Sequence, residues 1–261
     1  MSSLGSLDTG RIVPVPAQPA PATGPDTSLD SSPAPSATAY APPRRSAWAW
    51  SGLLAGVTGT VATAFTFTDP PESAVQGGPE AVYAALEGRG LVQAGASLGF
   101  VAVAALVVFA AGLARHVAAR VPVHSLVPAV LRTAFAGAVG ALILAFSFKA
   151  MLAGGMPGGI DESFTTKEDV AFLALLVSQG QWVGWIGVAI AMGASAYAAL
   201  RLGALPRWTG VVAAVFSLFV AGFVLVLCLP YSAGIVAPVW LVVVSVALLT
   251  SPKAQQPPVR G

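Results

Sequence analysis

Ionisable residues and cysteine are both scarce in this chain. Only 9% of its 261 residues are charged, and 56% are hydrophobic. This composition lies outside the range of soluble globular domains, and a net charge of +2 on so few ionisable groups provides no electrostatic footprint for nucleic acid. The single cysteine, Cys228, excludes an intrachain disulfide. Because Cys228 lies in an apolar stretch, we expect it to be a small buried hydrophobe.

Residue types that carry chemistry inside membranes are also missing. No acidic residue lies near the middle of an apolar stretch, which argues against a proton or cation relay. The two histidines, His116 and His124, fall in one connection between stretches, where we expect them to be solvated. They cannot ligate a membrane haem from there, and a zinc site would need further ligands nearby. The sequence therefore predicts no catalytic, cofactor-binding or metal site, and a protein that is not an enzyme.

The chain does contain six long apolar stretches. They cover approximately residues 47–68, 91–114, 126–148, 170–200, 208–229 and 235–250. A bilayer core about 30 Å thick needs roughly 20 residues of apolar helix, and only a helix satisfies its own backbone in lipid. The predicted fold class is therefore all-α, a polytopic bundle of six transmembrane helices within residues 47–252. We expect the fourth stretch to be one helix of about 46 Å, which must tilt or project into the cytoplasm.

The two ends of the chain and its charges predict an orientation. Residues 1–46 hold nine of the 21 prolines and lack apolar periodicity, so they are predicted to be a disordered tail, and residues 253–261 a short second tail. Ten of the 13 basic residues fall on the side of the two termini, and eight of the 11 acidic residues on the opposite side. By the positive-inside rule both termini are cytoplasmic. The predicted location is the plasma membrane, with the lipid bilayer and other membrane proteins as partners and no nucleic acid.

Charged residues near the ends of the stretches have structural explanations. We expect Arg132 and Lys149 to anchor the third stretch by reaching the two interfaces with their long side chains. The densest charge cluster, residues 161–169, could bind a cation or a basic partner. However, Thr166 followed three residues later by Asp169 is an N-cap pattern akin to a capping box. Capping is the explanation that we favour for this cluster.

The fourth stretch carries the one polar patch within a predicted span. Its members, at i, i+3, i+4 and i+7 of one helix face, are Ser178, Gln181, Trp182 and Trp185. Gln181 should lie near the middle of the membrane, where its amide needs a partner. One interpretation is a pocket for an apolar or amphipathic ligand, walled by the two tryptophans. The other is a helix contact, which the small-residue pair Gly180 and Gly184 favours.

One segment resembles a known group of proteins. The sequence Leu-Pro-Arg-Trp-Thr-Gly at residues 205–210 is similar to the L-P-R-W-x-G signature of uncharacterised actinobacterial integral membrane proteins with a domain of unknown function. Residues 239–249 resemble the last helix of the same proteins, and the likeness extends over roughly residues 47–252. That family has no assigned activity. The resemblance therefore implies a fold and a membrane location, and it transfers no functional residue.

Three functions remain open on these grounds. The leading prediction is a non-enzymatic accessory or interaction subunit of a process in the cell envelope. The alternative is a small transporter or a binder of lipophilic ligands that uses the polar patch of the fourth stretch. An integral membrane enzyme ranks third, because only the acidic cluster at residues 161–169 could supply its acid, base or metal ligands.

Overall fold

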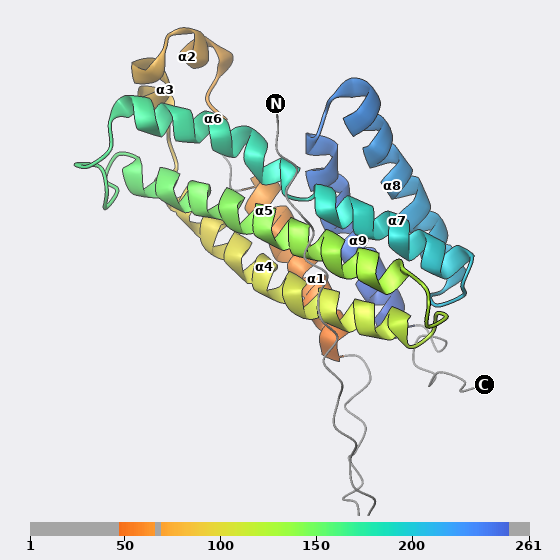
Figure 1. Cartoon of the computed structure of the whole chain (residues 1–261). Helices are drawn as coiled ribbons and strands as arrows, with labels where there is room; N and C mark the ends of the chain where they lie inside the picture. The colour runs from red at the N-terminus through yellow and green to blue at the C-terminus, as the bar shows by residue number, and fades with distance from the viewer. Residues whose placement is uncertain (1–46, 66–68, 251–261) are drawn as a thin grey trace, which may run out of the picture. The chain divides into compact units, whose positions relative to one another are not determined.

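The computed structural model describes residues 47–65 and 69–250, which belong to one compact unit. Every regular element in these ranges is a helix, which confirms the predicted all-α class (Figure 1). The tails predicted at residues 1–46 and 253–261 lie outside the described residues. The first described helix begins at Ala47 and the last ends at Thr250.

In residues 47–65 and 69–250, five helical segments are long and apolar enough to cross a membrane. They are α4 (Arg89–Ala118), α5 (Val127–Gly155), α6 (Lys167–Val183) continued by α7 (Ile186–Leu200), α8 (Arg207–Leu227) and α9 (Tyr231–Thr250). They coincide with the second to sixth predicted stretches. The chain is therefore a multi-pass membrane protein.

The first predicted stretch forms a shorter helix with an irregular end. It consists of α1 (Ala47–Thr60), which has 14 residues, and the π-helical turn η1 (Val61–Phe65). In a π turn the backbone hydrogen bonds join residues five apart, whereas in an α-helix they join residues four apart. Such turns are frequent at functional sites. Along its length α1 packs against α4 and α9. Gly52 makes this approach possible, because a Cβ there would lie 2.3 Å from both the Phe109 ring and the Ser245 hydroxyl.

The fourth stretch is not one continuous helix, so that prediction was wrong. α6 ends at Val183 and α7 begins at Ile186, and Figure 1 shows the two separated by a turn. Within this turn the Trp185 amide donates to the Trp182 carbonyl, only three residues earlier, at 3.3 Å. The apolar pattern continues across the turn, and Gly184 is the only local sign of an interruption.

Aromatic and aliphatic side chains from most of the helices fill the interior. The rings of Phe109 on α4 and Phe135 on α5 meet edge-on with centroids 6.1 Å apart, and Trp48 of α1 lies 5.8 Å from Phe109. α5 packs against α4, α6 and α7, whereas α8 contacts mainly α7 and α9. Only four residues of α8 are buried, so most of its apolar surface is available to lipid.

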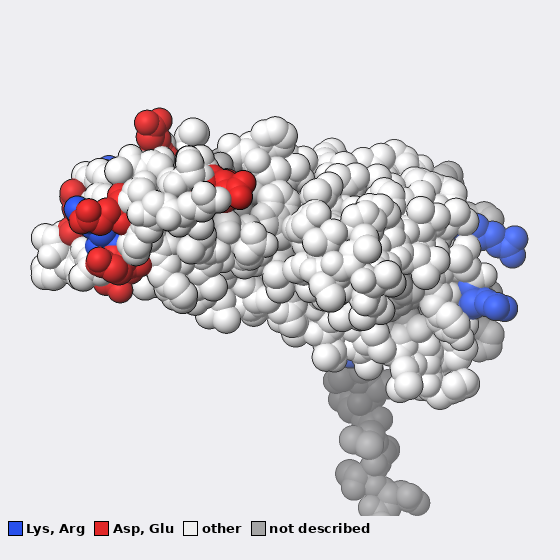
Figure 2. Space-filling model, turned by 90° about the horizontal axis from the view of Figure 1, so that it is seen from above, with Lys and Arg blue, Asp and Glu red and all other residues white. Residues whose placement is uncertain are grey.

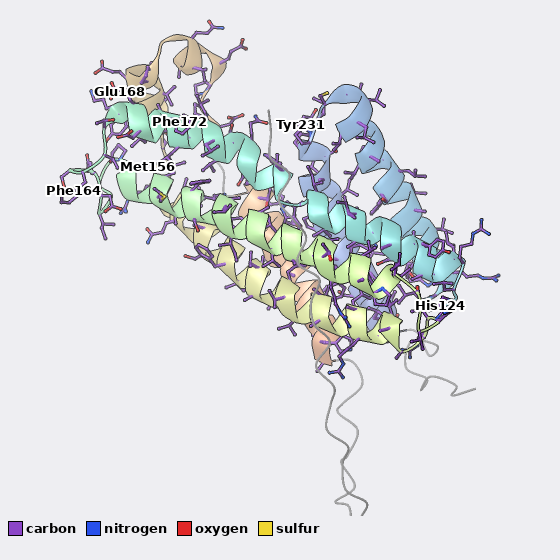
Figure 3. All side chains as sticks on the ribbon, in the orientation of Figure 1. His124, Met156, Phe164, Glu168, Phe172 and Tyr231 are labelled. Carbon is purple, nitrogen blue, oxygen red and sulfur yellow. The ribbon has the colours of Figure 1, made fainter. Side chains whose placement is uncertain are left out.

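Acidic and basic side chains gather at opposite ends of the described bundle, as Figure 2 shows. The acidic end includes two short helices, α2 (Glu72–Gln76) and α3 (Pro79–Ala85), the connection from α5 to α6 and the first turn of α6. Its eight carboxylates, all exposed, belong to Asp69, Glu72, Glu80, Glu87, Asp161, Glu162, Glu168 and Asp169. The basic end holds Arg115, Arg120, Arg201 and Arg207, and Figure 3 places His124 there and Glu168 at the acidic end.

The capping box predicted at the start of α6 is confirmed. The Asp169 amide donates to the Thr166 hydroxyl oxygen at 3.2 Å, and the Thr166 amide donates to the Asp169 carboxylate at 3.1 Å. This prediction succeeded because capping depends on residues that are neighbours in sequence.

Two other residues differ from their predicted settings. His116 is not in a solvated loop; it belongs to the last turn of α4 and is half-buried, with its ring 5.7 Å from that of Trp48. Cys228 is not a buried hydrophobe, because α8 ends one residue earlier. The cysteine is exposed and adopts a left-handed backbone conformation with φ of 53°.

Candidate functional site

Lys149 on α5 is a lysine without any exposed surface. Its relative exposure is 0%, although it lies only six residues before Gly155, where α5 ends. The Nζ atom donates to the backbone carbonyl of Ala62 at 2.6 Å and to the Oε1 atom of Gln181 at 3.1 Å. The predicted interfacial anchor is therefore wrong for this residue. Lys149 instead connects α5 to η1 and α6 inside the bundle.

The rotation of α5 explains the burial of Lys149. The buried face of this helix includes Leu142, Phe146 and Leu152, which lie at i−7, i−3 and i+3 relative to the lysine. Residues at these spacings share one side of a helix. The sequence signal that could have revealed the buried lysine was thus its position on the apolar stripe, and the distance to the helix end was misleading. Arg132, the other predicted anchor, is exposed.

Gln181 on α6 is also fully buried, and only the oxygen of its amide group forms a hydrogen bond within the described residues. Because an ammonium group can only donate hydrogen bonds, the amide must direct its oxygen to Lys149. The Nε2 atom then points elsewhere, and among the described residues no acceptor lies within hydrogen-bond distance of it. A buried donor without an acceptor costs about 1–3 kcal/mol. The amide is therefore held by a single hydrogen bond, the one from Lys149.

Trp185, in the turn between α6 and α7, binds the residue next to Ala62. Its indole N–H donates to the hydroxyl oxygen of Thr63 at 3.2 Å, and both side chains are fully buried. The indole ring lies over Gly59 of α1, where a Cβ would come within 2.6 Å of it. Two successive residues of the π turn are thus hydrogen-bonded from different parts of the bundle, Ala62 by Lys149 of α5 and Thr63 by Trp185 of the turn between α6 and α7. We call this set the Lys149 centre; it comprises Ala62, Thr63, Lys149, Gln181 and Trp185.

The four residues of the predicted polar patch have different surroundings. Gln181 and Trp185 belong to the Lys149 centre. The Ser178 hydroxyl donates to the carbonyl of Leu175 in its own helix at 2.8 Å. Trp182 lies against α9, because a Cβ at Gly234 would be 2.5 Å from its ring. The structure therefore brings two of the four together with Lys149, which the sequence indicated only as an interfacial anchor, and with Ala62 and Thr63, which it did not indicate.

The partners on η1 were missed for a physical reason. Ala62 contributes a backbone carbonyl, which any residue type could supply, so no side chain in the sequence indicates it. Thr63 could have been noticed as a hydroxyl in an apolar stretch, but threonine in membrane helices commonly bonds to its own backbone. Only the folded chain reveals that η1 faces Lys149.

The chemistry of the centre follows from its atoms. An ammonium group in the interior of a membrane protein is costly, and hydrogen bonds from a charged donor to oxygen offset part of that cost. The same nitrogen can hold or release a proton, and the oxygen atoms around it can hold a cation. Irregular backbone next to an interrupted helix is the arrangement in which many transporters bind ions and substrates. The centre has no exposed surface in this conformation.

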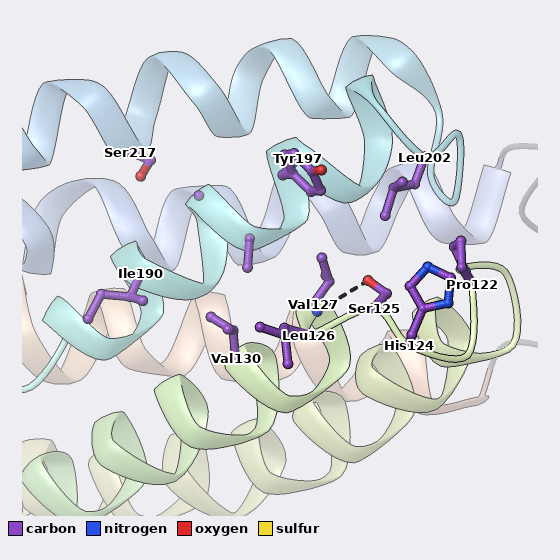
Figure 4. A pocket seen from close by; sticks show the side chains of 12 residues that line it. Pro122, His124, Ser125, Leu126, Val127, Val130, Ile190, Tyr197, Leu202 and Ser217 are labelled. Carbon is purple, nitrogen blue, oxygen red and sulfur yellow. Dashed lines mark hydrogen bonds between the residues drawn. The ribbon is translucent and has the colours of Figure 1, made fainter.

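Two hollows lie near the ends of the bundle. One of about 250 Å³ at the acidic end is lined by polar residues of α4, including Arg89 and Gln93, and by Asp161. A larger one of about 680 Å³ lies at the basic end, where His124 and Tyr197 border an apolar wall of α5 and α7 residues (Figure 4). No residue of the Lys149 centre lines either hollow. In the described part of the chain, no three His, Cys, Asp or Glu residues are grouped so as to hold a metal ion.

The chain matches no known family model, no curated protein and no solved structure. The resemblance to actinobacterial membrane proteins thus stays a prediction. The function must be argued from the Lys149 centre.

Proposed function

We propose that this chain is a six-span plasma-membrane protein with both termini in the cytoplasm, and that it is a small transporter which exchanges a proton for a solute at the Lys149 centre. The observation that carries the proposal is the complete burial of Lys149 between η1, α5 and α6. An ionisable residue inside a membrane bundle is expensive, and such residues commonly mark ion and proton pathways. The lack of acidic residues in the spans argued against a relay, but the buried amine of Lys149 is itself a group that can take up and release a proton.

The helix packing supports a sixth span. α1 and η1 together run from Ala47 to Phe65, which corresponds to about 27 Å of helix at 1.5 Å per residue. α1 packs against α4 and α9, and both of these are long and apolar enough to span. The separation of acidic and basic ends supports the orientation, because basic residues are enriched on the cytoplasmic side.

The irregular backbone around the lysine supports transport. A proton can reach Lys149 only if the bundle opens, and the π turn and the turn at Gly184 and Trp185 are the two places next to the centre where helical bonding is interrupted. Such interruptions let one half of a helix move without unwinding the other. The proposal involves no enzymatic step.

A role as an accessory or interaction subunit remains the second candidate. It is favoured by small residues of α5, since a Cβ at Gly137 or Gly140 would meet no atom within 4 Å. An open, small-residue face allows another membrane helix to approach closely.

The test uses the full-length protein in proteoliposomes that contain a pH-sensitive dye. Pulses of a panel of monovalent cations and anions should include at least one solute that changes the internal pH in a protein-dependent manner. Lys149→Gln should reduce this flux at least tenfold, because the amide can still donate to Ala62 but cannot carry a proton. Lys167→Gln, which changes an exposed lysine at the acidic end, is the matched control and should retain the flux.

Two results would refute transport. One is that no solute of either sign gives a pH change above that of empty liposomes. The other is that Lys149→Gln, with a wild-type elution volume and melting temperature, transports as well as the wild type.

A further inference from the structure

We infer that the solute exchanged at the Lys149 centre is a small monovalent cation, which replaces the Lys149 ammonium group at the oxygen atoms of Ala62 and Gln181. This inference rests on the proposed transport function and specifies its substrate class.

The lysine is itself a bound monovalent cation. Its Nζ atom is held by a backbone carbonyl at 2.6 Å and an amide oxygen at 3.1 Å, both uncharged acceptors. Carbonyl oxygens of irregular membrane segments bind alkali cations in channels and transporters through the same ion–dipole attraction. The next residue of η1, Thr63, holds this irregular segment in place by accepting a hydrogen bond from the Trp185 indole at 3.2 Å. A cation and a protonated lysine would therefore compete for one set of oxygens.

The amide of Gln181 is suited to such an exchange. Since its Nε2 atom has no acceptor among the described residues, moving its oxygen from Lys149 to another cation breaks only one hydrogen bond. A side chain with both ends of its amide bonded would resist this movement. The unused donor thus makes Gln181 the mobile ligand, and the Ala62 carbonyl the fixed one.

The surface nearest to the centre selects for positive charge. Lys149 lies six residues, or about 9 Å of helix, from the end of α5, where the Asp161 carboxylate would be 2.7 Å from a Cβ at Gly154. Eight exposed carboxylates surround this end, and Lys167 is engaged by Glu80 at 3.1 Å. A negative surface raises the local concentration of cations and lowers that of anions. An anion could accept hydrogen bonds from Gln181 and Lys149, but this surface opposes its approach.

The exchange conserves charge and atoms. As the cation binds, an N–H bond of the Lys149 ammonium breaks, the electron pair stays on nitrogen and the proton passes to water. The centre carries one positive charge before and after the step. The exchange is therefore one cation for one proton and is electrically neutral.

The test extends the proteoliposome assay with two sets of pulses. In the first set sodium, potassium or guanidinium is added as the chloride, so that alkali cations and an organic cation are compared. In the second set chloride, nitrate or phosphate is added as the choline salt. A cation entering in exchange for a proton should make the interior more alkaline, and the anion set should produce no protein-dependent change.

Variants at position 181 test whether the cation binds at the Gln181 amide. Gln181→Leu should raise the half-saturating cation concentration at least tenfold, because it removes a ligand. Gln181→Glu should shift the pH optimum upwards, because a carboxylate next to Lys149 favours the protonated amine. Gln179→Leu, at an exposed position of the same helix, is the matched control and should behave as the wild type.

The possible outcomes separate the two proposals. A pH change with anions but not with cations would overturn the cation inference and leave transport intact. Cation exchange that is unaffected by Gln181→Leu and Gln181→Glu would overturn the assignment of the site. Absence of any response would refute transport itself.

Discussion

The indole N–H of Trp185 donates to the hydroxyl of Thr63, 122 residues earlier in the chain, at 3.2 Å. Trp185 belongs to the interruption between α6 and α7, and Thr63 to the π turn that follows α1. The two irregular segments of the described bundle thus meet in one buried hydrogen bond. A movement of either segment must break this bond or displace the other segment.

A double-mutant cycle should detect this coupling. Trp185→Phe and Thr63→Val each remove one partner and keep most of the shape, and each should lower the free energy of unfolding by about 1–3 kcal/mol, because a buried polar group is left unpaired. The double variant should cost less than the sum of the two, since both partners are then gone. Reversible unfolding in mixed micelles provides the measurement. Strict additivity would show that the contact contributes no coupling.

The close packing of α5 and α7 predicts opposite effects at two glycines. A Cβ at Gly187 would lie 2.5 Å from the backbone carbonyl oxygen of Ala134, whereas a Cβ at Gly180 would meet no atom within 4 Å. Gly187→Ala should therefore lower the melting temperature in detergent, because backbone atoms cannot move aside as a side chain could. Gly180→Ala should raise stability by about 0.5–1 kcal/mol through its helix propensity. Equal melting temperatures for the two variants would contradict this packing.

The capping box predicts a local loss of stability at the start of α6. Thr166→Ala removes the oxygen that accepts from the Asp169 amide, and it should cost about 1 kcal/mol. Thr166→Ser keeps the oxygen and is the control. Amide hydrogen exchange should become faster in the first turn of α6 in the alanine variant only. Unchanged protection there would mean that the cap contributes nothing to this end of the helix.

Cysteine labelling should test the proposed orientation. Cysteines placed at Ser73 or Ser163 at the acidic end, in a Cys228→Ala background, should react with an impermeant maleimide on intact cells. A cysteine at Ser125, in the connection before α5, should react only after lysis. Rapid labelling of the Ser125 probe on intact cells would reverse or abolish the proposed topology.

The sequence was sufficient for the features that depend on composition or on near neighbours. In lipid, the backbone N–H and C=O groups of a segment must form hydrogen bonds with one another, so the apolar stretches had to be helices. The predicted limits of α4 and α8 are within a few residues of those observed. The capping box at Thr166 depends on four successive residues. Neither feature needs information about the rest of the fold.

The centre could not be predicted, because it depends on contacts between distant segments. Lys149 lies near a helix end, and only the rotation of α5 decides whether it reaches the interface or the interior. Gln181 was selected correctly as an amide that needs a partner, but the partner lies 32 residues away. The carbonyl of Ala62 has no sequence signature at all. The proposed site is thus made of two side chains of the predicted patch, Gln181 and Trp185, and of groups that acquire their role only on folding.

The position of Lys149 along α5 also affects the response to membrane potential. About 33 Å of helix separate it from Val127 at the basic end, and about 9 Å from Gly155 at the acidic end. One elementary charge that crosses the whole membrane gains or loses about 2.3 kcal/mol per 100 mV. A charge moving between the lysine and the acidic end therefore crosses about a fifth of the field, or ~0.5 kcal/mol per 100 mV. Binding of a cation or proton at the Lys149 centre from the acidic end therefore depends only weakly on the membrane potential. A stronger voltage dependence is expected for the movement of an ion between the centre and the basic end.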